Sequence, residues 1–281
     1  MTIQPDLVSL EKAIEAHPLE FRQDYLEIKG LRVEFDGFVA VKDVDLVVTS
    51  GDLRFLIGPN GAGKTTIIDA ITGVVKATGS ASFGGVELLG LPPHKIVRNG
   101  VGRTFQTASV IEKLTVLQNL DIAAGLHRKR GSLLRRRTAV PEEVAVALET
   151  IGCTDLANRP AGVLAHGQKQ WLEIGMLLVQ DARLLLLDEP VAGMSAAERE
   201  HTGALLKRIG AQRTVMVVEH DMDFLRSFAD SVTVLHQGSV LTEGTVAEVQ
   251  ANPAVVEVYL GSGGDHEDGD HEDAKKETDR C

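Results

Sequence analysis

From Tyr25 onward, short apolar runs alternate with turn residues along the chain. Residues 26–35 and 39–48 are rich in β-branched side chains and partly alternate between apolar and polar positions, which predicts two strands. The run LRFLIG at 53–58 is apolar and ends in a glycine, and the segment KTTIIDAIT after it has helical spacing that stops at Gly73. The pattern therefore predicts a strand, a glycine-rich loop and a helix in succession.

Two further apolar runs predict strands at the centre of a parallel sheet. The runs LLLLD at 184–188 and TVMVVEH at 214–220 consist of buried-type residues and end in charged ones. Central parallel strands present the side chains at their carboxyl ends to ligands, so these charged residues are candidates for chemistry. Residues 107–163 are predicted to be mostly helical, and residues 232–244 predict a hairpin that turns at Gln237 and Gly238.

The two ends of the chain differ from its middle. Residues 1–24 are expected to form an appendage with a short helix near 10–16, and residues 25–262 the folded unit. From Gly261 the sequence has almost no apolar content, so residues 263–281 are expected to be an acidic, disordered tail. Its near-repeat DHEDGDHED favours a solvating role over weak metal binding.

Composition narrows the classes of function. The net charge is −11, but the last 17 residues hold eight acids and three bases and contribute −5, so the rest is only mildly acidic and no nucleic-acid-binding surface is indicated. No run approaches the roughly 18 to 20 apolar residues that cross a bilayer, and the first residues do not resemble a signal peptide. Two cysteines give no disulfide framework, which suits a reducing cytoplasm.

The glycine-rich loop carries the most specific chemical signal. GPNGAGKT at 58–65 matches the phosphate-loop pattern GxxxxGK[ST], whose glycines let backbone N–H groups face a phosphate at the start of a helix. Lys64 is expected to reach the β- and γ-phosphates, and the Thr65 hydroxyl to ligate Mg²⁺. The candidate nucleotide-binding residues are Gly58, Pro59, Asn60, Gly61, Ala62, Gly63, Lys64, Thr65 and Thr66.

LLLLDEP at 184–190 supplies candidate partner carboxylates. Asp188 is expected to hold Mg²⁺, usually through water, and Glu189 to polarise the attacking water. An Asp-Glu pair after leucines is by itself more often a helix cap than a catalytic pair. The Asp-Glu pair indicates a catalytic site here because a phosphate loop precedes it in the same chain.

The order of the motifs resembles the ATP-binding cassette of ABC transporters. The phosphate loop is followed by Gln106 in VGRTFQ, then by LAHGQ at 164–168, LLLLDEP and VVEHD, and the resemblance covers about residues 26–260. It implies an α/β P-loop NTPase with a RecA-like parallel-sheet core, an N-terminal antiparallel β-subdomain and an α-helical subdomain inserted at about 107–180. It also implies ATPase activity, with ATP and Mg²⁺ as cofactors.

Three more site residues follow from the resemblance. Gln106 takes the Q-loop position, which contacts Mg²⁺ and the attacking water while touching the membrane partner. His220 takes the switch position at the γ-phosphate, although a lone histidine after a strand is by default a core residue. Phe35 takes the position of the aromatic ring that stacks on adenine, and a strand-end core residue is the alternative.

In this family the peptide Leu164, Ala165, His166, Gly167 and Gln168 contacts the nucleotide of a second subunit, because two cassettes pack head to tail. Here Ala165 replaces the usual serine, His166 replaces a glycine, and Ser195 stands where many cassettes have an aspartate. Two interpretations stay open. Either backbone N–H groups suffice for an active site, which we favour, or this composite site is weak and a second site hydrolyses most of the ATP.

The motifs GVGRTFQ, EPVAGM and EHDM resemble the branched-chain amino acid importer subfamily, and HGQKQWLEIGMLL and VLHQGSVLTEG most resemble the D-type ATP-binding subunit of urea importers. The resemblance implies a second ATPase subunit, integral membrane permeases and a periplasmic or extracellular solute-binding protein, with this subunit peripheral on the cytoplasmic face of the inner membrane. The function that this resemblance implies is ATP-driven uptake of a small polar solute, urea or short-chain amides above all. Branched-chain amino acid import and a lipopolysaccharide-export ATPase are the alternatives, and a binding module without hydrolysis is a further one. The basic run at 127–137 is interpreted as a solvated loop, with contact to lipid headgroups or permease as its alternative.

Overall fold

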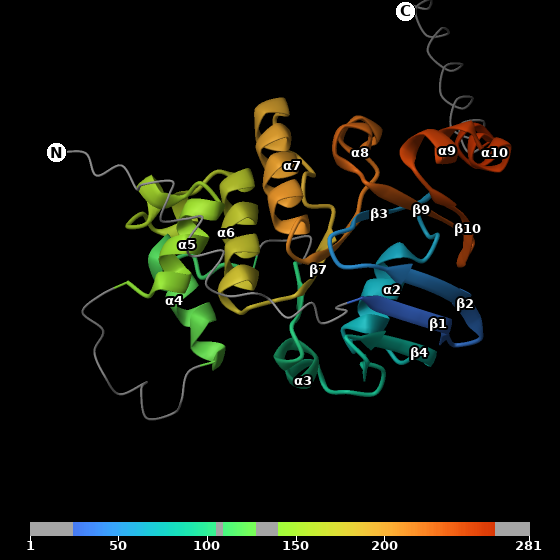
Figure 1. Cartoon of the computed structure of the whole chain (residues 1–281), viewed down its shortest axis with the longest axis horizontal. Helices are drawn as coiled ribbons and strands as arrows, with labels where there is room; N and C mark the ends of the chain where they lie inside the picture. The colour runs from blue at the N-terminus through green and yellow to red at the C-terminus, as the bar shows by residue number, and fades with distance from the viewer. Residues whose placement is uncertain (1–24, 105–108, 128–139, 262–281) are drawn as a thin grey trace, which may run out of the picture.

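The computed structural model describes residues 25–104, 109–127 and 140–261 of the chain. Figure 1 shows the helices α4, α5 and α6 at one end and the strands β1, β2 and β4 at the other, with β9 and β10 above these strands and β7 between the two ends. The arrangement is the mixed α/β fold that the sequence predicts.

The central sheet has six strands in the order β10-β9-β3-β8-β7-β6. Five of these strands are parallel, and β10 pairs antiparallel with β9. The strands are β3 (Leu53–Ile57), β6 (Val101–Arg103), β7 (Leu184–Asp188), β8 (Thr214–Val218), β9 (Ser231–His236) and β10 (Ser239–Gly244). Every residue of β7 and β8 is buried, as expected where both faces of a parallel sheet are covered.

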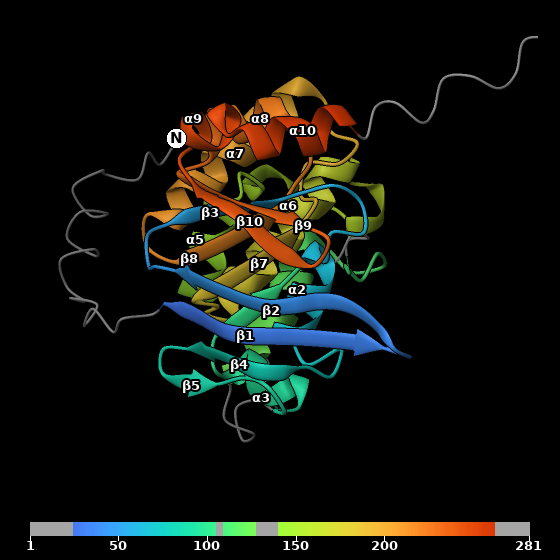
Figure 2. The same cartoon turned by 90° about the vertical axis from the view of Figure 1, so that its right-hand side faces the viewer.

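The second sheet is antiparallel and has the order β2-β1-β4-β5. Its strands are β1 (Leu26–Phe35), β2 (Phe38–Val48), β4 (Thr78–Phe83) and β5 (Val86–Glu87). In Figure 2 this sheet lies in the foreground, with β9 and β10 of the central sheet above it. One face carries the buried residues Leu26, Ile28, Leu31 and Val33, so the alternation in the sequence follows from burial of one face.

The described residues also form a series of helices. They are α2 (Lys64–Ile71), α3 (Pro93–Arg98), α4 (Val116–Ala123), α5 (Glu142–Thr150), α6 (His166–Val179), α7 (Ala196–Gly210), α8 (Met222–Phe228), α9 (Val246–Ala251) and α10 (Pro253–Gly261), with 3-10 turns η1 (Ala124–His127), η3 (Thr154–Leu156) and η4 (Ala161–Val163). Helices α4, α5 and α6 contact one another. Gly175 permits this approach, because a Cβ there would lie 2.8 Å from Ile151.

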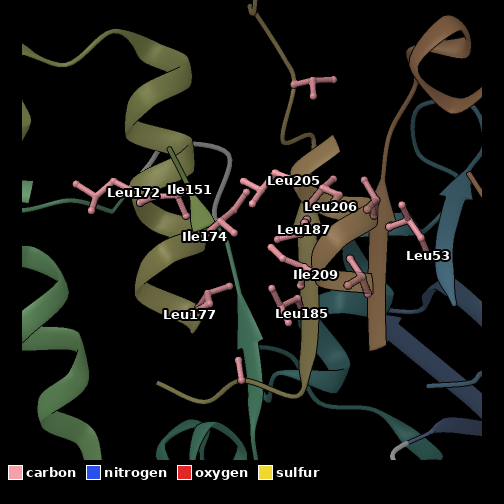
Figure 3. Close-up of a cluster of buried hydrophobic side chains, with 14 of the residues drawn as sticks. Leu53, Ile151, Leu172, Ile174, Leu177, Leu185, Leu187, Leu205, Leu206 and Ile209 are labelled. Carbon is pink, nitrogen blue, oxygen red and sulfur yellow. The ribbon is translucent and has the colours of Figure 1, made fainter. Parts of the chain in front are cut away.

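The helix α6 joins this helical group to the central sheet. Figure 3 shows Ile174 and Leu177 of α6 on the side that faces β7, and Leu172 on the other side of the helix. The residues drawn there belong to one buried cluster and include Leu172, Ile174, Leu177, Leu185, Leu187, Leu205, Leu206 and Ile209. Each fully buried leucine or isoleucine stabilises the fold by about 1.5–3 kcal/mol relative to an exposed one. The start of α6 is therefore held in a fixed relation to the sheet.

The structure confirms the strands predicted at 26–35 and 39–48 and the hairpin at Gln237 and Gly238. It adds elements that the hydrophobic pattern did not indicate, namely β4, β5, α9 and α10. The appendage 1–24, the tail 263–281 and most of the basic run lie outside the described residues. The boundaries of the folded unit and of the inserted helical subdomain stay predictions.

Candidate functional site

The glycine-rich loop connects β3 to α2 at the carboxyl end of the central sheet. Gly63 precedes the helix with φ 102°, and Gly58 has φ 149°, so both lie in backbone regions that L side chains rarely adopt. A Cβ at Gly58 would overlap the carbonyl oxygen of Leu235, and one at Gly63 would lie 2.8 Å from the carbonyl oxygen of Ala40. These two glycines are therefore required by β9 and β2, which pack against the loop.

Lys64 folds back across this loop. Its ammonium donates hydrogen bonds to the carbonyl oxygens of Gly58 (2.7 Å) and Pro59 (3.0 Å), and the residue is 8% exposed. Burial lowers the pKa of Lys64, and the negative charges of Glu189 and Asp188 oppose that shift. The loop, the N-terminus of α2 and this cation together form a concentration of positive charge suited to a polyphosphate.

Asp188 ends β7 beside the phosphate loop and is 2% exposed. Burial raises its pKa, while the nearby Arg103 guanidinium and a hydrogen bond from the Thr65 hydroxyl lower it. Within the described residues, its Oδ1 atom is buried and has no hydrogen-bond partner. An orphaned carboxylate oxygen next to a threonine hydroxyl fits a Mg²⁺ ion, which prefers carboxylate, hydroxyl and water oxygens.

Arg103 is a site residue that the sequence reasoning did not single out. Its guanidinium forms an ion pair with Asp69 on α2 and lies 3.7 Å from Oδ2 of Asp188. It also donates a hydrogen bond to the Thr72 hydroxyl. The signal was present in the VGRTFQ motif, but only the fold shows that β6 places this residue next to β7.

Glu189 and His220 meet at the ends of β7 and β8. The Nδ1 atom of His220 lies 3.4 Å from Oε1 of Glu189, and the side chains are 65% and 32% exposed. The backbone of Glu189 has φ 50°, which is uncommon for a residue with a side chain, and its N–H donates to the carbonyl oxygen of Val218. The structure thus brings together two residues that the sequence separates by a helix and a strand.

The peptide Leu164 to Gln168 begins α6. Ala165 occupies the N-cap position without a side-chain hydrogen bond, and its N–H donates to the Gln168 side chain at 3.0 Å. A Cβ at Gly167 would lie 2.8 Å from Oε1 of Glu198, so the first turn of α6 packs against α7 of the same chain. Ser195 is the N-cap of α7 and shares hydrogen bonds with the same Glu198.

Trp171 of α6 contacts α7. Its indole N–H donates to the Thr202 hydroxyl at 2.8 Å, and its ring lies 4.2 Å from the His201 ring. These contacts fix the side of α6 that faces α7.

Phe35 and Phe38 are cross-strand partners at the tip of the β1–β2 hairpin. Both rings are exposed, at 44% and 67%, so Phe35 does not lie in the core. The turn between them consists of Asp36 and Gly37, both with positive φ, which is typical of a two-residue hairpin turn. Gln106 lies outside the described residues, so its position stays a prediction.

Two further residues frame the site. The backbone of Gly58 hydrogen-bonds to the phenol of Tyr259 in α10, and burial raises the pKa of that phenol. Glu219, between β8 and His220, is 1% exposed and accepts hydrogen bonds from the backbone. Glu219 stands directly before His220 in the VVEHD motif, which assigns no role to it, whereas Tyr259 reaches the site only through the fold.

Comparisons with known proteins agree with this geometry. A family model described as ABC transporter matches residues 41–192, and one described as branched-chain amino acid ATP-binding cassette transporter matches residues 239–265. The fold and site define an ABC transporter ATPase. The chain belongs to the ATP-binding proteins of the branched-chain amino acid ABC transporter family.

Individual relatives support this membership. The chain is 38% identical over 248 residues to the high-affinity branched-chain amino acid transport ATP-binding protein BraF of Pseudomonas aeruginosa, covering 84% of this chain and 97% of that protein. It is 36% identical over 251 residues to LivG of Escherichia coli, a protein of the same description, covering 85% and 98%. A crystal structure of the ADP conformation of an ATP-binding cassette matches with a TM-score of 0.74, 30% identity and coverage of 85% and 99%.

Both relatives are described as branched-chain amino acid transport proteins, so they support the branched-chain amino acid alternative better than the urea importers that the sequence motifs most resemble. Among the described residues, no helix is both long enough and apolar enough to span a bilayer.

Proposed function

We propose that this chain binds and hydrolyses Mg·ATP to power an importer of branched-chain amino acids. The observation that carries the proposal is the meeting of Glu189 and His220, 3.4 Å apart, at the carboxyl ends of strands beside the phosphate loop and Lys64. A general base and a γ-phosphate contact are the groups that hydrolysis requires in addition to phosphate binding.

The residues divide the work as follows. The backbone N–H groups of the loop from Gly58 to Thr66 and the Lys64 ammonium hold the phosphates, and Thr65 and Asp188 hold Mg²⁺, with Gln106 as a further contact. The bound ion would neutralise charge on the phosphates. Glu189 orients and polarises the attacking water, and His220 stabilises the γ-phosphate as negative charge develops.

Phe35 offers an exposed aromatic face for adenine. The peptide from Leu164 to Gln168 of a second ATPase subunit completes the site from the other side, through the N–H groups at the start of its α6. Closure of two such subunits on ATP, and their separation after hydrolysis, would move the permease subunits. The second ATPase subunit, the permease subunits and a solute-binding protein are the proposed partners. The proposed location is the cytoplasmic face of the membrane.

The Glu189→Gln variant tests the proposed hydrolysis. In Glu189→Gln the amide keeps the shape of the side chain but cannot serve as a base, so ATP binding should persist while turnover falls to background and an ATP-bound dimer accumulates. Full turnover of this variant would refute the assigned base. Glu257→Gln, an exposed glutamate of α10, serves as the matched control.

The solute is tested on the intact assembly. Purified with its membrane partners and reconstituted in vesicles, the complex should hydrolyse ATP faster when leucine, isoleucine or valine is supplied with the solute-binding protein. The motifs shared with urea importers make urea and short amides the second candidates. Stimulation by urea and not by the amino acids would overturn the proposed solute while leaving the ATPase assignment intact.

A further inference from the structure

Glu219 is a buried carboxylate to which the proposed mechanism of hydrolysis assigns no role. It follows the last residue of β8, precedes His220, and is 1% exposed. A buried carboxylate costs free energy unless hydrogen bonds compensate for its lost hydration. The hydrogen bonds of this side chain therefore indicate what it does.

Each carboxylate oxygen of Glu219 accepts hydrogen bonds from a different loop. Oε1 accepts a hydrogen bond from the N–H of Val191 at 3.2 Å, in the segment that follows Glu189. Oε2 accepts from the N–H groups of His220 at 3.0 Å and Asp221 at 3.4 Å. One side chain thus connects the segment after β7 with the segment after β8 through backbone hydrogen bonds, and its Oε2 also lies 3.9 Å from Nδ1 of His220.

The other end of the histidine segment is held independently. The carboxylate of Asp221 accepts hydrogen bonds from the N–H groups of Asp223 and Phe224 and forms an ion pair with Arg199 of α7 at 2.7 Å. The backbone around His220 is therefore fixed on both sides, while its side chain stays 65% exposed. Such a frame limits motion of the backbone and leaves the imidazole free to meet a ligand.

We propose that Glu219 is a positioning residue that holds the segments carrying Glu189 and His220 in register, so that both side chains face the same phosphate. The inference rests on the roles of Glu189 and His220 in the proposed function. Glu219 is 1% exposed, so the proposal gives it no direct contact with the nucleotide. Its effect on hydrolysis is exerted through the backbone N–H groups of Val191, His220 and Asp221.

The test is a double-mutant cycle on turnover by the assembled transporter. Glu219→Gln keeps the size of the side chain but replaces one acceptor oxygen by a donor, so one of the two segments loses its hydrogen bond. With His220 intact, kcat should fall about tenfold to a hundredfold, the loss expected for hydrogen bonds to a charged group. ATP affinity, measured by equilibrium binding to the full chain, should change less than about twofold because the phosphate loop is untouched.

In the His220→Ala background, Glu219→Gln should lower the remaining turnover by less than about twofold, since the alignment of Glu189 with the imidazole no longer matters once the imidazole is gone. The same loss in both backgrounds, or an equal loss of ATP affinity, would show that Glu219 only supports the fold and would overturn the inference. If Glu219→Gln does not accumulate as folded protein, Glu219→Asp is measured in the same way, because its shorter side chain keeps the charge but cannot span both segments.

The outcome for His220→Ala alone separates this inference from the proposed function. If that variant hydrolyses ATP normally, the assignment of His220 fails, and the positioning role of Glu219 towards it fails as a consequence. If that variant keeps only a small residual turnover, and Glu219→Gln lowers it by the same factor as in the wild type, only the inference about Glu219 fails. Glu200→Gln, an exposed glutamate of α7, controls for the removal of a carboxylate.

Discussion

The imidazole of His220 and the carboxylate of Glu189 lie 3.4 Å apart, Nδ1 to Oε1, although 30 residues separate them in the chain. The parallel pairing of β7 and β8 sets this distance, because Asp188 and Val218 are register partners and each strand ends one or two residues before its functional side chain. The two residues are thus placed by the sheet, while His220 keeps an exposed side chain.

His220→Ala should remove turnover without removing ATP binding. General acid–base or charge-stabilising groups contribute about a hundredfold or more to rate, so kcat should fall by at least that factor. The side chain is 65% exposed, and its loss should change the free energy of unfolding by no more than about 0.5 kcal/mol. Steady-state ATPase assays measure kcat, equilibrium binding measures ATP affinity, and urea unfolding measures the free energy of unfolding. The exposed His94→Ala is the control. Undiminished kcat in His220→Ala would contradict the assignment.

Gly58→Ala should disrupt the phosphate loop. The added methyl would overlap the carbonyl oxygen of Leu235, and φ of 149° is unfavourable for alanine. Overpacking of this kind costs about 1–3 kcal/mol, and the loop should lose ATP affinity as its N–H groups move. Thermal unfolding and ATP titration measure the two effects. Gly125→Ala, where the methyl meets open space, is the matched control, and equal behaviour of both variants would disprove the geometric argument.

Ala165→Ser tests whether the departure at the start of α6 weakens the site. Ala165 occupies the N-cap position with φ −61° and ψ 160°, so a serine there should stabilise the helix by about 0.5–2 kcal/mol. Because backbone N–H groups are expected to suffice for the partner's phosphate, turnover of the assembled complex should change less than about twofold. A large gain in turnover would instead support the interpretation that the natural composite site is weak.

Asp221 gives a prediction for the dependence of stability on pH. Hydrogen bonds from the backbone of α8 and the charge of Arg199 hold the pKa of this carboxyl below its ordinary value, against the opposing effect of burial. Because the folded pKa lies below the unfolded one, the stabilisation is present above the unfolded value and is lost as pH falls through the folded one. Asp221→Ala should therefore lower stability by about 1 kcal/mol near neutral pH, where the cap and ion pair are lost.

The difference in unfolding free energy between wild type and Asp221→Ala should shrink as the pH falls below about 4, where the unfolded carboxyl becomes protonated. Urea unfolding at a series of pH values measures it. Asp223→Ala, which removes a carboxylate that is 94% exposed from the same helix, is the matched control. A difference for Asp221→Ala that stays constant between neutral and acidic pH would refute the assigned cause.

The sequence by itself determined the parts of the protein whose residues are close together in the chain. The loop from Gly58 to Thr65, the strand before it and the helix after it were predictable, because backbone geometry, helix start and phosphate-binding pattern all depend on neighbouring residues. The buried strands at 184–188 and 214–218 were predictable for a similar reason, since each is a continuous apolar run.

Only the tertiary structure decided which distant residues meet. Arg103 lies beside Asp188 because β6 pairs with β7, Glu219 reaches Val191 because β7 pairs with β8, and Gly167 is small because α7 brings Glu198 against it. A local pattern cannot specify such contacts, since strand order and helix packing arise from the burial of apolar surface over the whole fold. Short motifs thus determine which chemical groups the site contains, and the sheet that joins the motifs determines how these groups are positioned relative to one another.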